Sequence, residues 1–142
     1  MKLLHLDSSI LGDNSASREL SGAVVARWQD AVPGLEVAYR DLASAPLPHL
    51  SGASLAGVDP GETAEAGRVM QEFLDADVVV VGAPMYNFGV PSTLKSWLDR
   101  VLVAGKTFRY AESGPQGLVG GKKVVVVSSR GGAHQDSGSD FQ

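Results

Sequence analysis

Three short runs of apolar residues constrain the fold of this chain more than any other feature. Leu3–Leu6, Val78–Val81 and Val124–Val127 are each followed by small or polar residues. Runs this short and this apolar are typical of strands in a parallel sheet that helices cover on both faces. A fourth segment, Leu35–Arg40, alternates apolar and polar positions and predicts a strand nearer the edge of the sheet.

Between these runs the apolar residues change to the period of three to four that an amphipathic helix shows. The three predicted helical stripes consist of Leu20, Ala23, Val24 and Trp28; of Ala66, Val69, Met70, Phe73 and Leu74; and of Leu94, Trp97, Leu98, Val101 and Leu102. Alternating strands and helices with right-handed crossovers predict an α/β fold, a doubly wound parallel sheet with helices on both faces. Residues 42–60 show no clear period, and we expect them to form an interface or lid segment.

Composition excludes several classes of function. A chain of 142 residues predicts one domain, and its net charge of −4 argues against a broad basic surface for nucleic acid or an anionic membrane. The absence of cysteine excludes disulfides, thiol nucleophiles, Cys-ligated zinc and iron–sulfur clusters. His5 lies in the first predicted strand and is expected to pack in the core, and His49 and His134 have no carboxylate or histidine neighbours at metal-ligand spacing, so no metal site is predicted. No apolar stretch reaches the ~20 residues of a membrane span, and we expect a cytoplasmic protein.

The first candidate site is the loop after the first predicted strand. In open α/β sheets, ligands bind beyond the carboxyl ends of the strands, where the strand order reverses. Residues 7–17 lie at such an end, are rich in hydroxyl groups and lead into a helix. Backbone N–H groups at a helix start favour a phosphate, and Ser9, Ser15 and Ser17 would add hydroxyl donors. The alternative is an ordinary loop that ends in a serine cap.

Two further loops follow buried strands. Residues 82–91 carry Met85, Tyr86, Asn87 and Phe88, a cluster that indicates a flat apolar ligand, or else packing under the loop or at a subunit contact. Residues 128–132 combine a fixed positive charge with paired glycines, which allow a ligand to approach the backbone closely, although a simple turn would look the same. Together the three loops offer a phosphate cradle, a flat apolar wall and a rim of amide donors, a combination that matches a flavin mononucleotide better than an adenine dinucleotide.

Longer motifs resemble one known family. The segments that carry the resemblance are Ala83-Pro84-Met85-Tyr86-Asn87-Phe88, Leu94-Lys95-Ser96-Trp97-Leu98-Asp99-Arg100-Val101, Gly105-Lys106-Thr107-Phe108-Arg109-Tyr110, Gly114-Pro115-Gln116-Gly117-Leu118, Gly121-Lys122-Lys123 and Ser129-Arg130-Gly131-Gly132. They are similar to the FMN-dependent NADH-azoreductases, which are flavodoxin-like quinone reductases. The resemblance covers nearly all of the chain.

The resemblance implies a flavodoxin-like domain over residues 1–142 and a set of flavin contacts. The residues that would bind FMN are Ser9, Ser15, Ala16 and Ser17 at the phosphate, Pro84, Met85, Tyr86, Asn87 and Phe88 at the isoalloxazine, and Ser129, Arg130, Gly131 and Gly132 at its pyrimidine side. Many relatives carry a polar side chain at position 16, so Ala16 would contribute only its backbone N–H. The family continues into a final strand and helix, so we expect a domain that is incomplete at its C-terminus, with Val124–Val127 as an exposed apolar edge.

The resemblance also implies an activity. A homodimer with FMN near its interface would use NADH or NADPH to reduce quinones and aromatic azo compounds, in a ping-pong reaction. The flavin N5 would carry the chemistry, so no catalytic side chain is predicted. We expect the Tyr86/Phe88 loop, residues 42–60 and the helix of Trp97 to line the dimer interface. A non-enzymatic electron carrier of the flavodoxin type is the alternative, although such carriers are usually more acidic.

Overall fold

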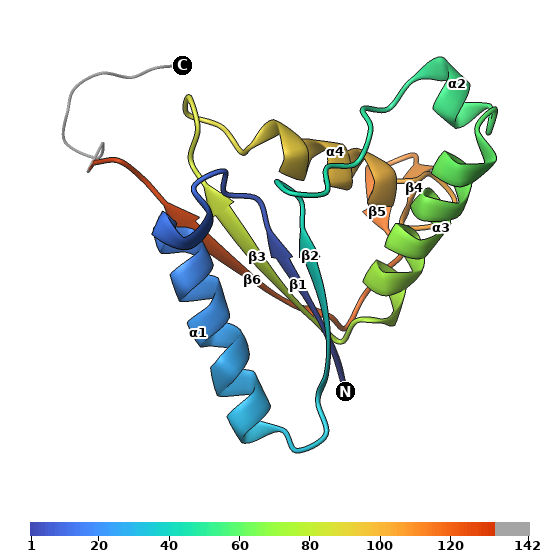
Figure 1. Cartoon of the computed structure of the whole chain (residues 1–142). Coiled ribbons are helices and arrows are strands. Elements are labelled where there is room, and N and C mark those ends of the chain that lie inside the picture. Colours follow the sequence, from blue (N-terminus) through green and yellow to red (C-terminus); the bar gives the residue numbers. More distant parts are fainter. Residues whose placement is uncertain (133–142) are drawn as a thin grey trace.

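The main sheet of the computed structural model, which describes residues 1–132, has four parallel strands (Figure 1). In spatial order they are β2 (Glu36–Asp41), β1 (Lys2–Asp7), β3 (Val78–Pro84) and β6 (Lys123–Ser129). The chain moves from β1 to one neighbour, β2, and then crosses to the other neighbour, β3, so the strand order reverses at β1. The predicted doubly wound parallel sheet is confirmed.

Three long helices cover the sheet, one on one face and two on the other (Figure 1). Helix α1 (Ala16–Ala31) lies alone on its face, whereas α3 (Pro60–Asp75) and α4 (Ser92–Val101) share the opposite face. Ser15 caps α1, and Asp59 caps α3 just before a proline, which suits the first helical position because that position needs no N–H. All three predicted helices are confirmed.

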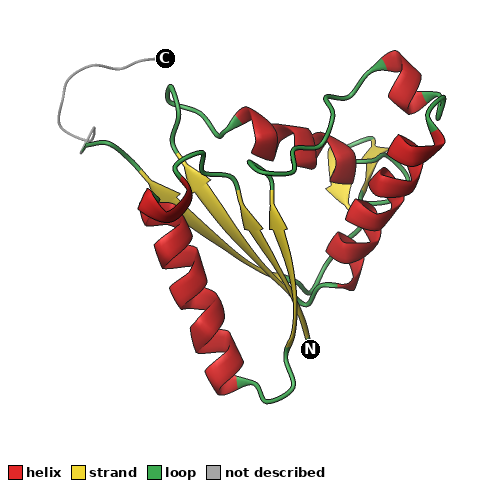
Figure 2. Ribbon diagram, viewed as in Figure 1, coloured by secondary structure: helices red, strands yellow, loops and turns green. Residues whose placement is uncertain are grey.

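The sequence analysis missed the short elements (Figure 2). They are the 3₁₀ helix Gly12–Asn14, helix α2 (Gly52–Leu55), and a hairpin of β4 (Phe108–Ala111) and β5 (Gly114–Gly117). The segment 42–60 is not purely a surface segment, because Leu42 and Leu47 are buried in the core beneath α3 and α4. Elements of three or four residues are too short to show a hydrophobic period.

The two faces of the sheet have separate cores. Alternate residues of each strand point to opposite faces, so Leu6 and Val81 pack with α3 and α4, whereas Leu3 and Val80 pack against α1. Among the residues that the structure describes, no helix is both long enough and apolar enough to cross a membrane.

The predicted apolar stripe of α1 is only partly correct, because Val24 and Trp28 pack half-buried against the core of this face whereas Leu20 and Ala23 are exposed. Leu20 is 52% exposed, and the buried positions of this helix are Ser17, Ser21 and Val25. The two serines face the sheet at a place where space is limited: a Cβ on Gly82 would lie 2.5 Å from a carboxylate oxygen of Asp7. Hydrogen bonds to buried polar groups therefore replace apolar contacts over part of this interface.

The last strand is also less buried than predicted. Val124 and Val126 are 56% and 61% exposed, although the continuous valine run indicated burial on both faces. Within the described residues, β6 pairs only with β3, and neither α3 nor α4 reaches far enough to cover these two side chains. The expected exposed apolar edge is therefore present.

Candidate functional site

The loops that follow β1, β3 and β6 meet at the carboxyl edge of the sheet (Figure 1). Hydrogen bonds join them; among these, the amide of Ile10 donates to the hydroxyl of Tyr86 at 3.0 Å, and the amide of Met85 donates to the carbonyl of Ser129 at 2.8 Å. The three loops singled out in the sequence therefore form one surface, at the point where the strand order reverses and ligands bind in folds of this kind.

The first loop ends in a group of donors at the start of α1. Ser9, Ser15 and Ser17 are buried, and the hydroxyls of Ser15 and Ser17 lie 3.1 Å apart. Ser15 accepts the amide of Arg18, whereas the amides of Ala16 and Ser17 have no acceptor among the described residues. Unpaired amides at a helix start, together with the helix dipole, favour an anion. The residues present therefore fit a phosphate group.

The second loop is a tight turn that presents two exposed side chains. Tyr86 and Gly89 exchange two backbone hydrogen bonds, of 2.9 and 3.0 Å, around Asn87 and Phe88. Those two residues have φ angles of 51° and 62°, in the left-handed region that asparagine tolerates and phenylalanine does not favour. Phe88 is 59% exposed. Backbone strain of this kind concentrates at functional sites, which supports a ligand-binding role for the turn.

The side chains flanking this turn have different surroundings. Pro84 is buried as the last residue of β3, and Met85 is half-buried. The hydroxyl of Tyr86 lies 3.3 Å from that of Ser9, so the aromatic loop touches the proposed phosphate site directly. In the third loop, Ser129 is half-buried, and Arg130, Gly131 and Gly132 are exposed after the end of β6. All the predicted site residues therefore lie on the three joined loops or at the ends of the helix and strands that flank them.

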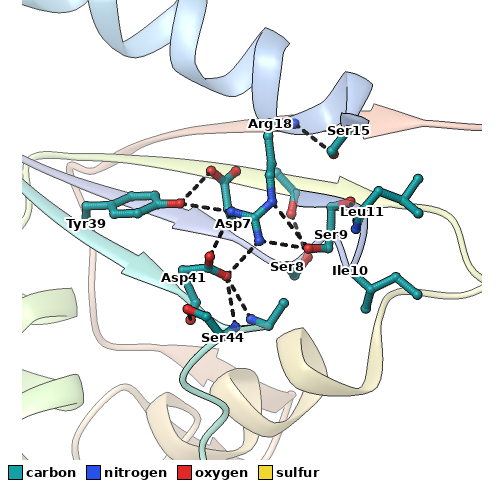
Figure 3. A network of polar contacts seen from close by, with 12 residues as sticks. Asp7, Ser8, Ser9, Ile10, Leu11, Ser15, Arg18, Tyr39, Asp41 and Ser44 are labelled. Carbon is teal, nitrogen blue, oxygen red and sulfur yellow. Dashed lines mark hydrogen bonds and ion pairs between the residues drawn. The ribbon is translucent and has the colours of Figure 1, made fainter. Parts of the chain in front are cut away.

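A buried carboxylate lies beneath the first loop (Figure 3). Asp7 is 3% exposed; it accepts hydrogen bonds from Ser21 at 2.7 Å and Tyr39 at 3.2 Å, and His5 Nε2 lies 3.4 Å away. Burial alone would raise the pKa of Asp7, but the hydrogen bonds from these three neighbours hold it below the usual value. These hydrogen bonds therefore favour the ionised carboxylate.

Arg18 connects this first loop to the end of β2 (Figure 3). Its guanidinium donates to both carboxylate oxygens of Asp41, at 2.7 and 2.9 Å, and through Nε and Nη2 to the carbonyl of Ser9, at 3.3 and 2.8 Å. A further bond of 3.1 Å reaches the hydroxyl of Tyr39. The hydrogen bond from Arg18 lowers the pKa of Asp41 to about 2.

Sequence reasoning missed Asp7, Arg18, Tyr39 and Asp41. One signal was available, because Asp7 and Asp41 directly follow two predicted strands, and the carboxyl ends of adjacent parallel strands meet. His5 is packed in the core, as predicted.

No metal cluster is found within residues 1–132: the structure shows no group of three or more His, Cys, Asp or Glu side chains arranged to hold an ion. His134 lies outside the described residues. His49 lies in the segment before α2, where its Nδ1 is 3.1 Å from the hydroxyl of Ser96.

Comparisons with known proteins agree with this geometry. Residues 1–142 match a family model described as flavodoxin-like fold. An FMN-dependent NADH:quinone oxidoreductase of Stenotrophomonas maltophilia is 63% identical over 142 residues, which are 100% of this chain and 73% of that protein. An FMN-dependent NADH:quinone oxidoreductase of Pseudomonas putida is 58% identical over 144 residues, a match that covers 94% of this chain and 71% of that protein. The chain belongs to the FMN-dependent NADH:quinone oxidoreductase family.

A solved structure shows the same relationship at lower identity. The crystal structure of azoreductase from Bacillus anthracis matches this fold with a TM-score of 0.85 at 30% identity, over 97% of this chain and 73% of that chain. Membership of the quinone oxidoreductase family confirms the resemblance drawn from the segment that begins at Ala83 and the predicted flavodoxin-like fold. The individual flavin contacts stay predictions.

Proposed function

We propose that this chain binds FMN and uses NADH or NADPH to reduce quinones and aromatic azo compounds by two electrons. The observation that carries the proposal is the pair of unpaired amides at Ala16 and Ser17, set among buried hydroxyls and joined through Tyr86 to an exposed aromatic turn. A phosphate group and a flat ring system would each find matching surroundings on one surface. The names of the FMN-dependent relatives support the same cofactor.

In this proposal the chain binds and orients the cofactor. The amides of Ala16 and Ser17 hold the phosphate, and the turn of Asn87 and Phe88 lies against the ring. The positive charge of Arg130 favours a negative charge at the pyrimidine side. FMN, when bound, supplies a centre that accepts hydride and returns two electrons, so the chain needs no acid, base or nucleophile of its own.

The donor and the acceptor would use the same surface in turn, which predicts ping-pong kinetics. We also propose a homodimer, because large apolar side chains are exposed around the site, among them Ile10, Leu11, Phe88 and Val90. Trp97 does not contribute directly to such an interface, since it is 3% exposed and packs against Phe73. A cytoplasmic location follows from the proposed nicotinamide donor, which is a cytoplasmic metabolite.

Flavin titration followed by reduction tests the proposal. We expect the apoprotein to bind FMN more tightly than FAD, since the donors at α1 suit a terminal phosphate. Free NADH should then bleach the bound flavin under anaerobic conditions without a partner reductase, and a quinone should restore its colour. Bound flavin that NADH leaves oxidised would identify an electron carrier instead. Tighter binding of FAD than of FMN would contradict the proposed phosphate site.

A further inference from the structure

We infer that Arg18 is a positioning residue that shapes the phosphate site without touching the phosphate, an inference that rests on the proposed FMN function. A guanidinium has five N–H donors, and Arg18 makes five contacts, to Ser9, Tyr39 and Asp41. Its side chain is 17% exposed. All five N–H groups are used in these contacts, so none is available to a ligand. Arg18 therefore affects the site only through its hydrogen-bond partners.

The first of these groups is the carbonyl of Ser9, which accepts two of the five N–H groups. A carbonyl oxygen that faced a phosphate would repel it. Because Arg18 holds this oxygen, the hydroxyl of the same residue stays beside Tyr86, and the following amide, that of Ile10, donates to Tyr86 as well. Arg18 thus fixes the orientation of the loop at its contact with the aromatic turn.

The second group is a pair of carboxylates. Asp7 and Asp41 are register partners on neighbouring strands, and both lie on the α1 face of the sheet. Like charges side by side are destabilising, and both would also oppose a bound phosphate. The two-pronged bond from Arg18 neutralises Asp41, and Tyr39 bridges Arg18 to Asp7. Loss of Arg18 would leave a carboxylate without its cation next to the phosphate site.

The chain offers a matched control on the opposite face. Arg40, the residue before Asp41, is also 17% exposed and donates to two carboxylates, Glu65 and Glu72, of α3. It has a similar burial and a similar set of partners, but it points away from the three loops. Replacement of Arg40 therefore measures the cost of losing a half-buried ion pair without altering the proposed site.

We compare the affinities of each variant for FMN and for riboflavin, which lacks the phosphate. This comparison distinguishes a specific effect on the phosphate site from a general loss of structure. We expect Arg18→Gln to weaken FMN binding by about tenfold or more, because charge-assisted hydrogen bonds that order the loop are lost. Riboflavin binding should fall by a smaller factor, of about threefold or less, since only the contact of the first loop with the aromatic turn is affected. Arg40→Gln should lower the stability of the protein and leave the ratio of the two affinities unchanged.

Two milder variants cover the case in which Arg18→Gln does not fold. Arg18→Lys keeps the charge and loses the planar fork, so it should lower the affinity ratio of FMN over riboflavin. Asp41→Asn removes a negative charge, which by charge alone would strengthen FMN binding; release of the Arg18 fork should weaken it instead.

Equal losses for both flavins in the Arg18 variants, or tighter FMN binding by Asp41→Asn, would overturn the positioning role. Wild-type protein that binds neither flavin would instead refute the proposed function itself.

Discussion

The two faces of the main sheet are held by different interactions, although the same strands build both. On the face of α3 and α4, apolar side chains such as Leu6, Val69 and Trp97 form a continuous buried cluster. On the face of α1, a smaller apolar cluster adjoins a network of buried polar groups centred on Asp7 and Ser21. Apolar burial is not directional, whereas hydrogen bonds are. The comparison indicates that one face supplies stability and the other fixes the orientation of α1 and its first loop.

The largest effect should come from the apolar face. Trp97→Ala removes a nearly fully buried side chain that packs edge-on against Phe73, with the two ring centroids 5.7 Å apart. We expect this substitution to lower the unfolding free energy by about 3–5 kcal/mol. Its indole N–H has no hydrogen-bond partner among the described residues, so the loss is one of packing. The matched variant Trp28→Ala, at a half-buried position on the α1 face, should cost less than about half as much. Equal losses in urea denaturation would remove the distinction between the faces.

A smaller effect should come from the polar network. Ser21→Ala leaves the buried carboxylate of Asp7 without its shortest hydrogen bond, of 2.7 Å, and we expect a loss of about 1–3 kcal/mol. Ser96→Ala is the control on the opposite face, because that hydroxyl is similarly buried but contacts no carboxylate: it lies near the carbonyl of Ser92 in its own helix and 3.1 Å from His49 Nδ1. It should cost about 1 kcal/mol or less. A larger cost at Ser96 than at Ser21 would contradict the structural role of the network.

Acid should weaken the ion pair of the α1 face, with the smallest expected effect. The pKa of Asp41 is lowered from 3.8 to about 2, so its ion pair contributes stability that is present above about pH 4 and lost as the pH falls towards 2. Between these values the unfolded chain binds a proton that the folded chain does not. Asp41→Asn should flatten the fall in unfolding free energy over this range, whereas Trp97→Ala should lower it equally at every pH. An unchanged slope in Asp41→Asn would contradict the assignment.

Much of this protein could be predicted from short-range patterns. The four strands of the main sheet, the three long helices and their alternation follow from runs and periods within about ten residues, which local sequence reports directly. The three loops of the candidate site also followed, because parallel strands place their carboxyl ends at one edge. Membership of the family could likewise be predicted from the resemblance of segments such as Ala83 to Phe88.

Only the tertiary structure decided which side chains form the buried polar network and the ion pairs around the candidate site. The buried face of α1 is polar because Asp7 occupies the space beside Gly82, a contact between residues far apart in the sequence. The pairing of Arg18 with Asp41 likewise depends on β2 lying next to β1 in a register that brings two carboxylates together. Hydrophobic periods report which segments are buried, but hydrogen bonds and ion pairs depend on distances of a few ångströms between separate elements. Those distances exist only once the chain has folded.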